Sequence, residues 1–300
     1  MTQSTVSLKL EIEDIVDIKS VLSTYGWHED SIINEYVALR MKNDRGSVMT
    51  LYTSKKIVFQ GNEDFSELVG LIKRGCESSS VGTLEAHIGV DEVGKGDYFG
   101  PLVVVSCFIS KEIQEKLLCL GVGDSKKFSD ERILKMYSSL KDYEYYYPSI
   151  VSPTEYNTLY EKYRNASVLL AKQHAKVIEM GLEDLKQKGI ECQYVVIDQF
   201  SSKKSRVLDE LGSLGKEVDF RQFHKGESDM AVATASVLAR GLFLVEREKM
   251  KEQYYFDFPK GASDVIFQAK EFVQRYGTEE LGKVAKISFK TTAKVLQSSF

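Results

Sequence analysis

Residues 88–101 read IGVDEVGKGDYFGP and lead directly into the apolar run LVVV at 102–105. A short β-branched segment enters this stretch and a longer one leaves it, which is typical of two strands joined by a tight turn. Neighbouring side chains of a strand point to opposite faces, so Asp91 and Glu92 cannot both lie in the core. An inward carboxylate needs a cation, a metal ion or a proton. The stretch predicts a hairpin that carries functional acids, and an acidic turn in solvent is the alternative.

The composition is that of a soluble globular protein. Of the 300 residues, 43% are hydrophobic and 28% are charged. This length is enough for one large domain or two ordinary ones. A net charge of −4 argues mildly against non-specific DNA binding, although a local basic surface can coexist with it. No apolar signal segment opens the chain, the run 101–109 is too short to cross a bilayer, and the cysteines form no C-x-x-C pair. We therefore expect a cytoplasmic protein with reduced thiols and no membrane partner.

The first 75 residues are typical of a small α+β domain. Apolar periodicity predicts strands over 4–10, 35–42, 47–53 and 56–60, and helices over 13–25 and 65–72. One helical layer on an antiparallel sheet leaves the other sheet face open, which favours a binding platform. A structural or dimerising domain is the alternative. Residues 76–84 are mostly small and polar and predict a linker.

Residues 85–300 alternate between helical and strand patterns after the hairpin, which predicts an α/β domain with a mixed sheet. The expected helices are 111–120, 129–140, 166–188, 203–211 and a long one from 227, and the expected strands are 143–151, 193–197 and 217–220. The C-terminal part is expected to be helical, with an exposed basic face formed by Lys283, Lys286, Lys290 and Lys294.

Four acids stand at distinctive places in this domain. Asp91 and Glu92 end one strand, Asp198 ends another, and Glu227 begins a helix. Such positions converge at one edge of an α/β sheet. Carboxylates without cysteine or histidine partners select hard cations, Mg²⁺ or Mn²⁺. Two such ions can activate water and stabilise the leaving oxygen of a phosphodiester.

Two other kinds of chemistry fit the residues less well. Residues 89–96 nearly spell a nucleotide-binding P-loop, but Gly96 stands where that loop needs Ser or Thr, and Asp91 and Glu92 would repel phosphates. Covalent catalysis by Ser125 or Lys126 has no base partner in the sequence. The glycines around Lys95 instead suit a close approach of backbone amides to a nucleic-acid strand.

These motifs together resemble the type 2 ribonuclease H family. Residues 91–101 are similar to its first motif, in the form of the bacterial ribonuclease HIII branch. Residues 123–126 resemble its Asp-Ser-Lys loop, and residues 197–198 resemble the strand of its third acid. Residues 225–228, followed by 233–240, resemble the fourth-acid motif and its helix. The resemblance runs in the family's order over roughly residues 85 to 250.

The resemblance implies an RNase H-like catalytic domain over 85–300, preceded by a TATA-binding-protein-like substrate-binding domain over 1–75 and a linker over 76–84. It also implies metal-dependent endonucleolysis of the RNA strand of RNA–DNA hybrids, leaving 3′-hydroxyl and 5′-phosphate ends. We expect a monomer that acts in DNA replication and repair. A binding module that keeps the fold but does not cleave is the alternative, and a metal-dependence assay separates the two.

The resemblance also assigns roles to residues. The catalytic, metal-binding acids are expected to be Asp91, Glu92, Asp198 and Glu227. The substrate contacts are expected to be Gly94, Lys95, Gly96, Ser125 and Lys126. Two departures stand out: Glu227 replaces the more common Asp, with Asp229 nearby, and Lys95 replaces the Arg common in ribonuclease HII. The resemblance therefore does not imply a strict preference of this chain for RNA–DNA junctions.

Overall fold

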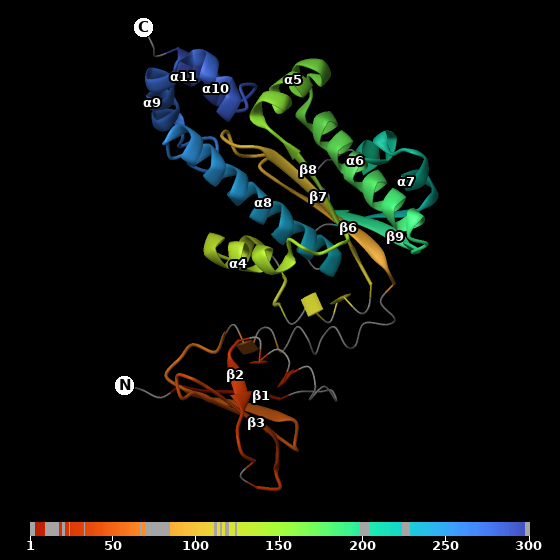
Figure 1. Cartoon of the computed structure of the whole chain (residues 1–300), viewed down its shortest axis with the longest axis vertical. Coiled ribbons are helices and arrows are strands. Elements are labelled where there is room, and N and C mark those ends of the chain that lie inside the picture. Colours follow the sequence, from red (N-terminus) through yellow and green to blue (C-terminus); the bar gives the residue numbers. More distant parts are fainter. Residues whose placement is uncertain are drawn as a thin grey trace. The chain divides into compact units, whose positions relative to one another are not determined.

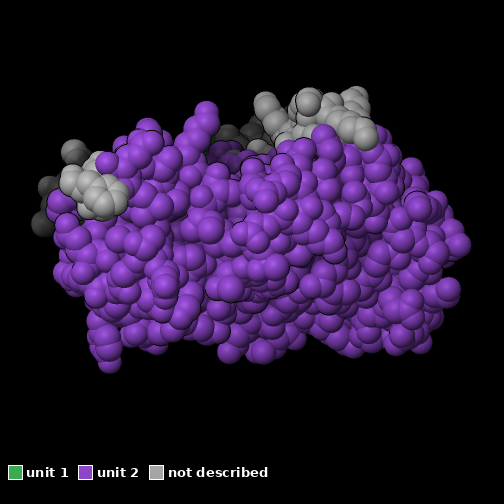
Figure 2. Space-filling model, turned by 90° about the horizontal axis from the view of Figure 1, so that it is seen from above, with its two compact units in different colours: residues 1–84, 111–121 green, residues 85–110, 122–300 purple. Residues whose placement is uncertain are grey.

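The computed structural model describes residues 4–9, 18–19, 22–23, 25–32, 34–66, 68–69, 72, 85–110, 113–114, 116–117, 120–123, 125–198, 204–223 and 229–297. The chain divides into two compact units, one of residues 1–84 with 111–121 and one of residues 85–110 with 122–300. Figure 2 colours the units separately and shows a face of the larger one.

The smaller unit is built on an antiparallel sheet. Its described strands pair in the order β1-β5-β4-β3-β2. They are β1 (Ser4–Lys9), β2 (Trp27–Glu29), β3 (Val37–Asn43), β4 (Val48–Tyr52) and β5 (Lys56–Gly61). One sheet face is buried against helical residues, among them Ile18 and Leu22, with the rings of Trp27 and Phe59 5.8 Å apart. Strand β2 was not predicted because three residues are too few to show an alternation.

The larger unit contains a mixed sheet, as expected. Its described strands run in the order β10-β9-β6-β7-β8. They are β6 (His87–Val93), β7 (Leu102–Ile109), β8 (Tyr146–Val151), β9 (Tyr194–Asp198) and β10 (Asp219–Phe223). Strands β6 and β7 form the predicted antiparallel hairpin, while β9 runs parallel to both β6 and β10. The central strand β6 thus joins the hairpin to the parallel half of the sheet.

Helices cover both faces of this sheet (Figure 1). The helices of the unit are α4 (Asp130–Leu140), α5 (Pro153–Tyr163), α6 (Ala166–Gln187), α7 (Ser213–Glu217), α8 (Met230–Tyr254), α9 (Ile266–Tyr276), α10 (Thr278–Val284) and α11 (Lys290–Leu296). Helix α8 packs on β6 at Gly89, where an added Cβ would lie 2.2 Å from the Val232 nitrogen. Helix α6 packs on the opposite face, with Gly181 against Ile88. Alternate residues of β6 therefore face different helices.

The C-terminal helices enclose a separate aromatic core. Phe256, Phe258 and Phe272 pack there with Tyr98 and Phe99, which follow the glycine turn. Phe99 forms an isolated antiparallel bridge with Ala285. The end of the chain is thereby attached to the segment just after the acidic hairpin strand.

Several sequence expectations need correction or lie outside the described residues. Residues 204–210 form two short 3₁₀ turns, Lys204–Arg206 and Leu208–Glu210, in place of a helix. Helix α8 begins at Met230, because Asp229 caps it. Lys286 is fully buried, which contradicts the predicted exposed lysine face. Only parts of the expected helices 13–25, 65–72 and 111–120 are described, and those parts are helical except at Tyr25, Phe65 and Leu120.

In the described part of the chain, no helix combines the length and apolar character that a membrane crossing needs.

Candidate active site

Strand β6 presents its two adjacent acids to different helices. Asp91 shares a face with Gly89 and points toward α8, where Ser236 donates a hydrogen bond to it. Glu92 shares a face with Ile88 and points toward α6, where His174 Nε2 lies 3.0 Å from its Oε2. The two-residue period of a strand explains this division.

Glu92 is held by two basic side chains. Its side chain is only 4% exposed and also accepts a 2.6 Å hydrogen bond from Lys95 Nζ. Burial favours the protonated form, but the hydrogen bond and attraction of His174, together with Lys95, bring the pKa of Glu92 below its usual value. Glu92 is therefore a carboxylate at neutral pH.

The pKa of Asp91 is shifted in the opposite direction. Part of its surface remains accessible, yet the protein packed around it and the neighbouring charge of Glu92 raise the pKa of Asp91 to about 7. The hydrogen bond from Ser236 offsets part of this rise, and the charge of Asp198 adds to it. Both acids are largely enclosed, contrary to the expectation that only one could be, because helices cover both faces of the sheet. Two largely enclosed acids so close together favour a bound cation.

Asp198 lies beside Asp91 because β6 and β9 are parallel neighbours. The last paired residues of the two strands are Val90 and Ile197, so Asp91 and Asp198 follow at the same level. The side chain of Asp198 raises the pKa of Asp91 through its charge. The structure thus brings together three of the four predicted acids.

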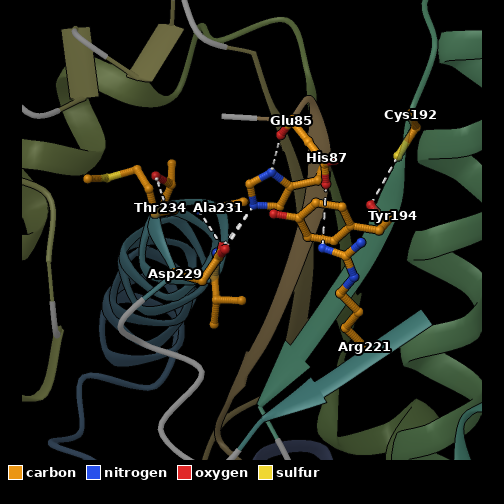
Figure 3. Close-up of polar contacts among 10 residues, drawn as sticks. Glu85, His87, Cys192, Tyr194, Arg221, Asp229, Ala231 and Thr234 are labelled. Carbon is orange, nitrogen blue, oxygen red and sulfur yellow. Dashed lines mark hydrogen bonds and ion pairs between the residues drawn. The ribbon is translucent and has the colours of Figure 1, made fainter. Parts of the chain in front are cut away.

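Glu227, the fourth predicted acid, lies outside the described residues. Its neighbour Asp229 is engaged in structure: its Oδ1 accepts hydrogen bonds from the backbone nitrogens of Ala231 and Val232 at the start of α8. His87 Nε2 lies 2.9 Å from its Oδ2 (Figure 3). His87 is four residues before Asp91, a separation of about 13 Å along a strand. Asp229 therefore anchors the helix start to the beginning of β6.

The glycine turn follows the acids directly. Gly94 has φ +92°, and an added Cβ would lie 2.2 Å from the Pro101 oxygen, so only glycine fits there. The turn closes with a 3.2 Å hydrogen bond from the Asp97 nitrogen to the Gly94 oxygen. Lys95 and Gly96 are exposed at its tip. The turn can thus offer backbone and ammonium donors next to the carboxylates.

The second predicted loop is divided between core and surface. Ser125 is buried and its Oγ lies 2.7 Å from Ser236 Oγ, while Arg240 donates to its carbonyl. Because Ser236 also bonds Asp91, Ser125 is connected to the acids through one hydroxyl. Lys126 is exposed, and Asp124 lies outside the described residues.

The donor chemistry of the three acids fits a divalent metal ion. All their ligand atoms are carboxylate oxygens, which Mg²⁺ and Mn²⁺ prefer. Among the residues that the structure describes, no three acidic, histidine or cysteine side chains are arranged as a metal site. Asp91, Glu92 and Asp198 therefore offer suitable donor oxygens but do not by themselves form a metal site in the described structure.

The comparisons with known proteins identify the family. A family model described as Ribonuclease HII matches residues 88–292. The chain belongs to the ribonuclease HII family. A protein named Ribonuclease HIII from Protochlamydia amoebophila is 37% identical over 260 residues, 84% of this chain and 84% of that protein. Another, from Streptococcus pneumoniae, is 32% identical over 286 residues, 93% of this chain and 95% of that protein. The predicted ribonuclease HIII branch is confirmed, and the chain is a ribonuclease H, a hydrolase.

Solved structures confirm the fold class. Bst-RNase HIII in complex with Mn²⁺ matches with a TM-score of 0.67 and 25% identity, covering 98% of both chains. Aquifex aeolicus RNase H3 matches with a TM-score of 0.55 and 26% identity over 95% of this chain and all of that one. The likeness includes the small N-terminal sheet domain as well as the RNase H-like domain, as predicted.

Sequence reasoning missed the residues that support the acids, His174 and Ser236. His174 lies on the buried stripe of α6 with Leu170 and Val177, and a titratable residue on such a stripe signals a buried partner. Ser236 lies within an alanine-rich helix, where nothing in the local sequence distinguishes it from a small packing residue.

Proposed function

We propose that this ribonuclease H cuts the RNA strand of RNA–DNA hybrids internally and leaves 3′-hydroxyl and 5′-phosphate ends. The observation that carries the proposal is the meeting of Asp91 and Glu92 on β6 with Asp198 on β9. Glu227 completes the proposed ligand set for two Mg²⁺ or Mn²⁺ ions. When bound, these ions would activate a water molecule and stabilise the leaving oxygen of the phosphodiester.

The surrounding residues have supporting roles in this proposal. His174 holds Glu92 ionised and oriented, and the hydrogen bond from Ser236 orients Asp91.

The glycine turn is the proposed site of RNA-strand recognition. Backbone amides of Gly94, Lys95 and Gly96 would contact the backbone near the cut phosphate, where a 2′-hydroxyl distinguishes RNA from DNA. Lys95 would contribute a charge without the planar fork of an arginine, which favours general cutting of hybrids over strict junction recognition. Ser125 and Lys126 would contact the substrate backbone nearby.

The N-terminal domain, residues 1–75 before a linker over 76–84, is the proposed platform for the hybrid, and residues 85–300 are the proposed catalytic domain. In strand β3 of the N-terminal domain, Arg40 and Lys42 alternate with the buried Leu39 and Met41. Arg40 and Lys42 therefore lie on the sheet face opposite the buried one. Register places Arg40 beside Thr50 and Lys42 beside Val48, and Lys56 of β5 lies on the same face. Among the described strand residues, this face holds no acidic side chain, although Asp30 pairs with Arg40. A basic sheet face suits a phosphate backbone.

We further propose that the protein works as a cytoplasmic monomer on hybrids that arise in DNA replication and repair. Its widely spaced cysteines support a reducing compartment.

A cleavage assay with labelled substrates tests the proposal. The purified protein is offered an RNA–DNA hybrid and the same RNA as a single strand and as a duplex, with Mg²⁺, Mn²⁺ or EDTA. Metal-dependent internal cuts confined to the RNA strand of the hybrid are expected. Binding without cutting under every metal would instead favour a non-catalytic module.

A further inference from the structure

Lys286 is a fully buried lysine in the loop between α10 and α11. Its Nζ donates to main-chain carbonyls, at 2.6 Å to the Gly100 oxygen and 2.9 Å to the Asp97 oxygen. The ring of Tyr156 lies 5.7 Å from the same nitrogen. Burial lowers the pKa of Lys286 to about 7, and the nearby charge of Asp97 only partly opposes this. Burying an amine costs stability. The hydrogen bonds that the amine donates are therefore the feature that can explain a lysine at this position.

The carbonyls that Lys286 holds belong to the segment that leaves the glycine turn. The backbone around Lys286 runs beside that segment: its nitrogen donates to the Tyr98 oxygen, and the Gly100 nitrogen donates to the Val284 oxygen, both at 2.9 Å. One side chain therefore satisfies two carbonyls that this short ladder leaves without a backbone donor.

Asp97 transmits this support to the turn. Its nitrogen closes the turn by donating to the Gly94 oxygen, its oxygen accepts from Lys286, and its carboxylate accepts a 2.6 Å bond from the Gly261 nitrogen. The peptide groups on both sides of Asp97 are thereby fixed. Without Lys286, the turn would lose one of the hydrogen bonds that support its C-terminal side, three residues from Gly94.

We propose that Lys286 is a positioning residue that holds the Gly94–Lys95–Gly96 turn in the shape that binds the substrate. The inference rests on the proposed function of that turn. It assigns to the C-terminal helices a part in substrate binding that requires no contact between them and the nucleic acid.

The test compares Lys286→Met with Thr291→Val. Thr291 is also buried in the C-terminal part and donates to a carbonyl, that of Ala262, which lies outside the turn. Lys286→Met should raise KM for the hybrid about tenfold, the equivalent of one or two lost hydrogen bonds, and change kcat less than about twofold. Thr291→Val should lower thermal stability but leave KM unchanged. A folded Lys286→Met protein with the wild-type KM would overturn the proposal.

Two further measurements keep the result decisive. If Lys286→Met does not fold, Lys286→Gln, which keeps a donor for one carbonyl, takes its place: a raised KM is expected, and the wild-type value would refute the role. Amide hydrogen exchange of residues 94–97 should quicken in the Lys286 variant and not in Thr291→Val. Exchange is measured without substrate, so it tests Lys286 even if the wild-type protein fails to cut hybrids, the outcome that would sink the proposed function itself.

Discussion

Two neighbouring residues, Asp91 and Glu92, acquire different properties because they point to different helices. The hydrogen bond from His174 keeps Glu92 ionised, whereas burial and the charge of Glu92 raise the pKa of Asp91 to about 7. A divalent ion would remove the repulsion between these acids, so the arrangement gives metal binding a favourable electrostatic term.

Asp91→Asn and Asp198→Asn should each lower the cleavage rate on the order of a thousandfold or more, because each removes a proposed metal ligand. Single-turnover cleavage of a labelled hybrid measures this effect. Folding and hybrid binding should be preserved, as circular dichroism and a binding assay would show. Wild-type turnover by either variant would refute the assignment of the acids.

His174→Ala should raise the Mg²⁺ concentration needed for half-maximal activity about tenfold, because Glu92 loses the group that orients it. Calorimetric titration of the free protein with Mn²⁺ should show the same weakening. Gln173→Ala is the matched control, since Gln173 is also buried on α6 but accepts its hydrogen bond from Ser149. Equal metal requirements in His174→Ala and the wild type would show that Glu92 does not depend on this histidine.

At the scale of elements, the contact between β6 and α8 brings the acids and Ser236 together. The strand and helix approach so closely at Gly89 that an added Cβ would meet the backbone of Ala231 and Val232. Asp229 fixes the start of the same helix against His87 (Figure 3). Both contacts set the position of α8 along the strand.

Gly89→Ala should therefore destabilise the fold by about 1–3 kcal/mol or more, since backbone atoms cannot move aside as a flexible side chain could. Urea unfolding measures the loss. Gly282→Ala in α10 is the control: its Cβ would meet only Asn157, at 3.9 Å, so no loss is expected. Equal stabilities for Gly89→Ala and the wild type would contradict the close packing.

At the scale of the whole molecule, stability should depend on pH through Lys286. Its pKa falls from 10.5 to about 7 on folding, so between these values the unfolded chain binds a proton that the folded protein has released. Stability then rises with pH in this window, by up to about 1.4 kcal/mol per pH unit. The unfolding free energy of the wild type minus that of Lys286→Met should therefore increase from pH 7 to pH 9. A constant difference would contradict the lowered pKa.

Deleting residues 1–75 should mainly weaken binding of the hybrid, because it removes the basic sheet face with Arg40, Lys42 and Lys56. We expect KM to rise about tenfold or more and the salt dependence of binding to become shallower. Binding isotherms at several salt concentrations measure both, after circular dichroism has verified that the shortened protein is folded. Unchanged affinity would refute the platform role.

The sequence by itself determined the hairpin and the mixed sheet, because strand alternation and glycine turns are local signals. It also placed Asp91, Glu92 and Asp198 at strand ends that the structure brings together. The motif at 88–101 was sufficient to indicate the family. Asp198 could be singled out because a buried strand ends at it.

Only the tertiary structure decided which residues support those acids. His174 and Ser236 come from helices far away in the chain, and a helical pattern predicts burial without naming the partner. Lys286 was expected in solvent because lysines at helical spacing usually form an exposed face, yet packing of the C-terminal helices places it over the carbonyls of Asp97 and Gly100. Such contacts depend on how elements dock, and docking is set by long-range packing that no local pattern records.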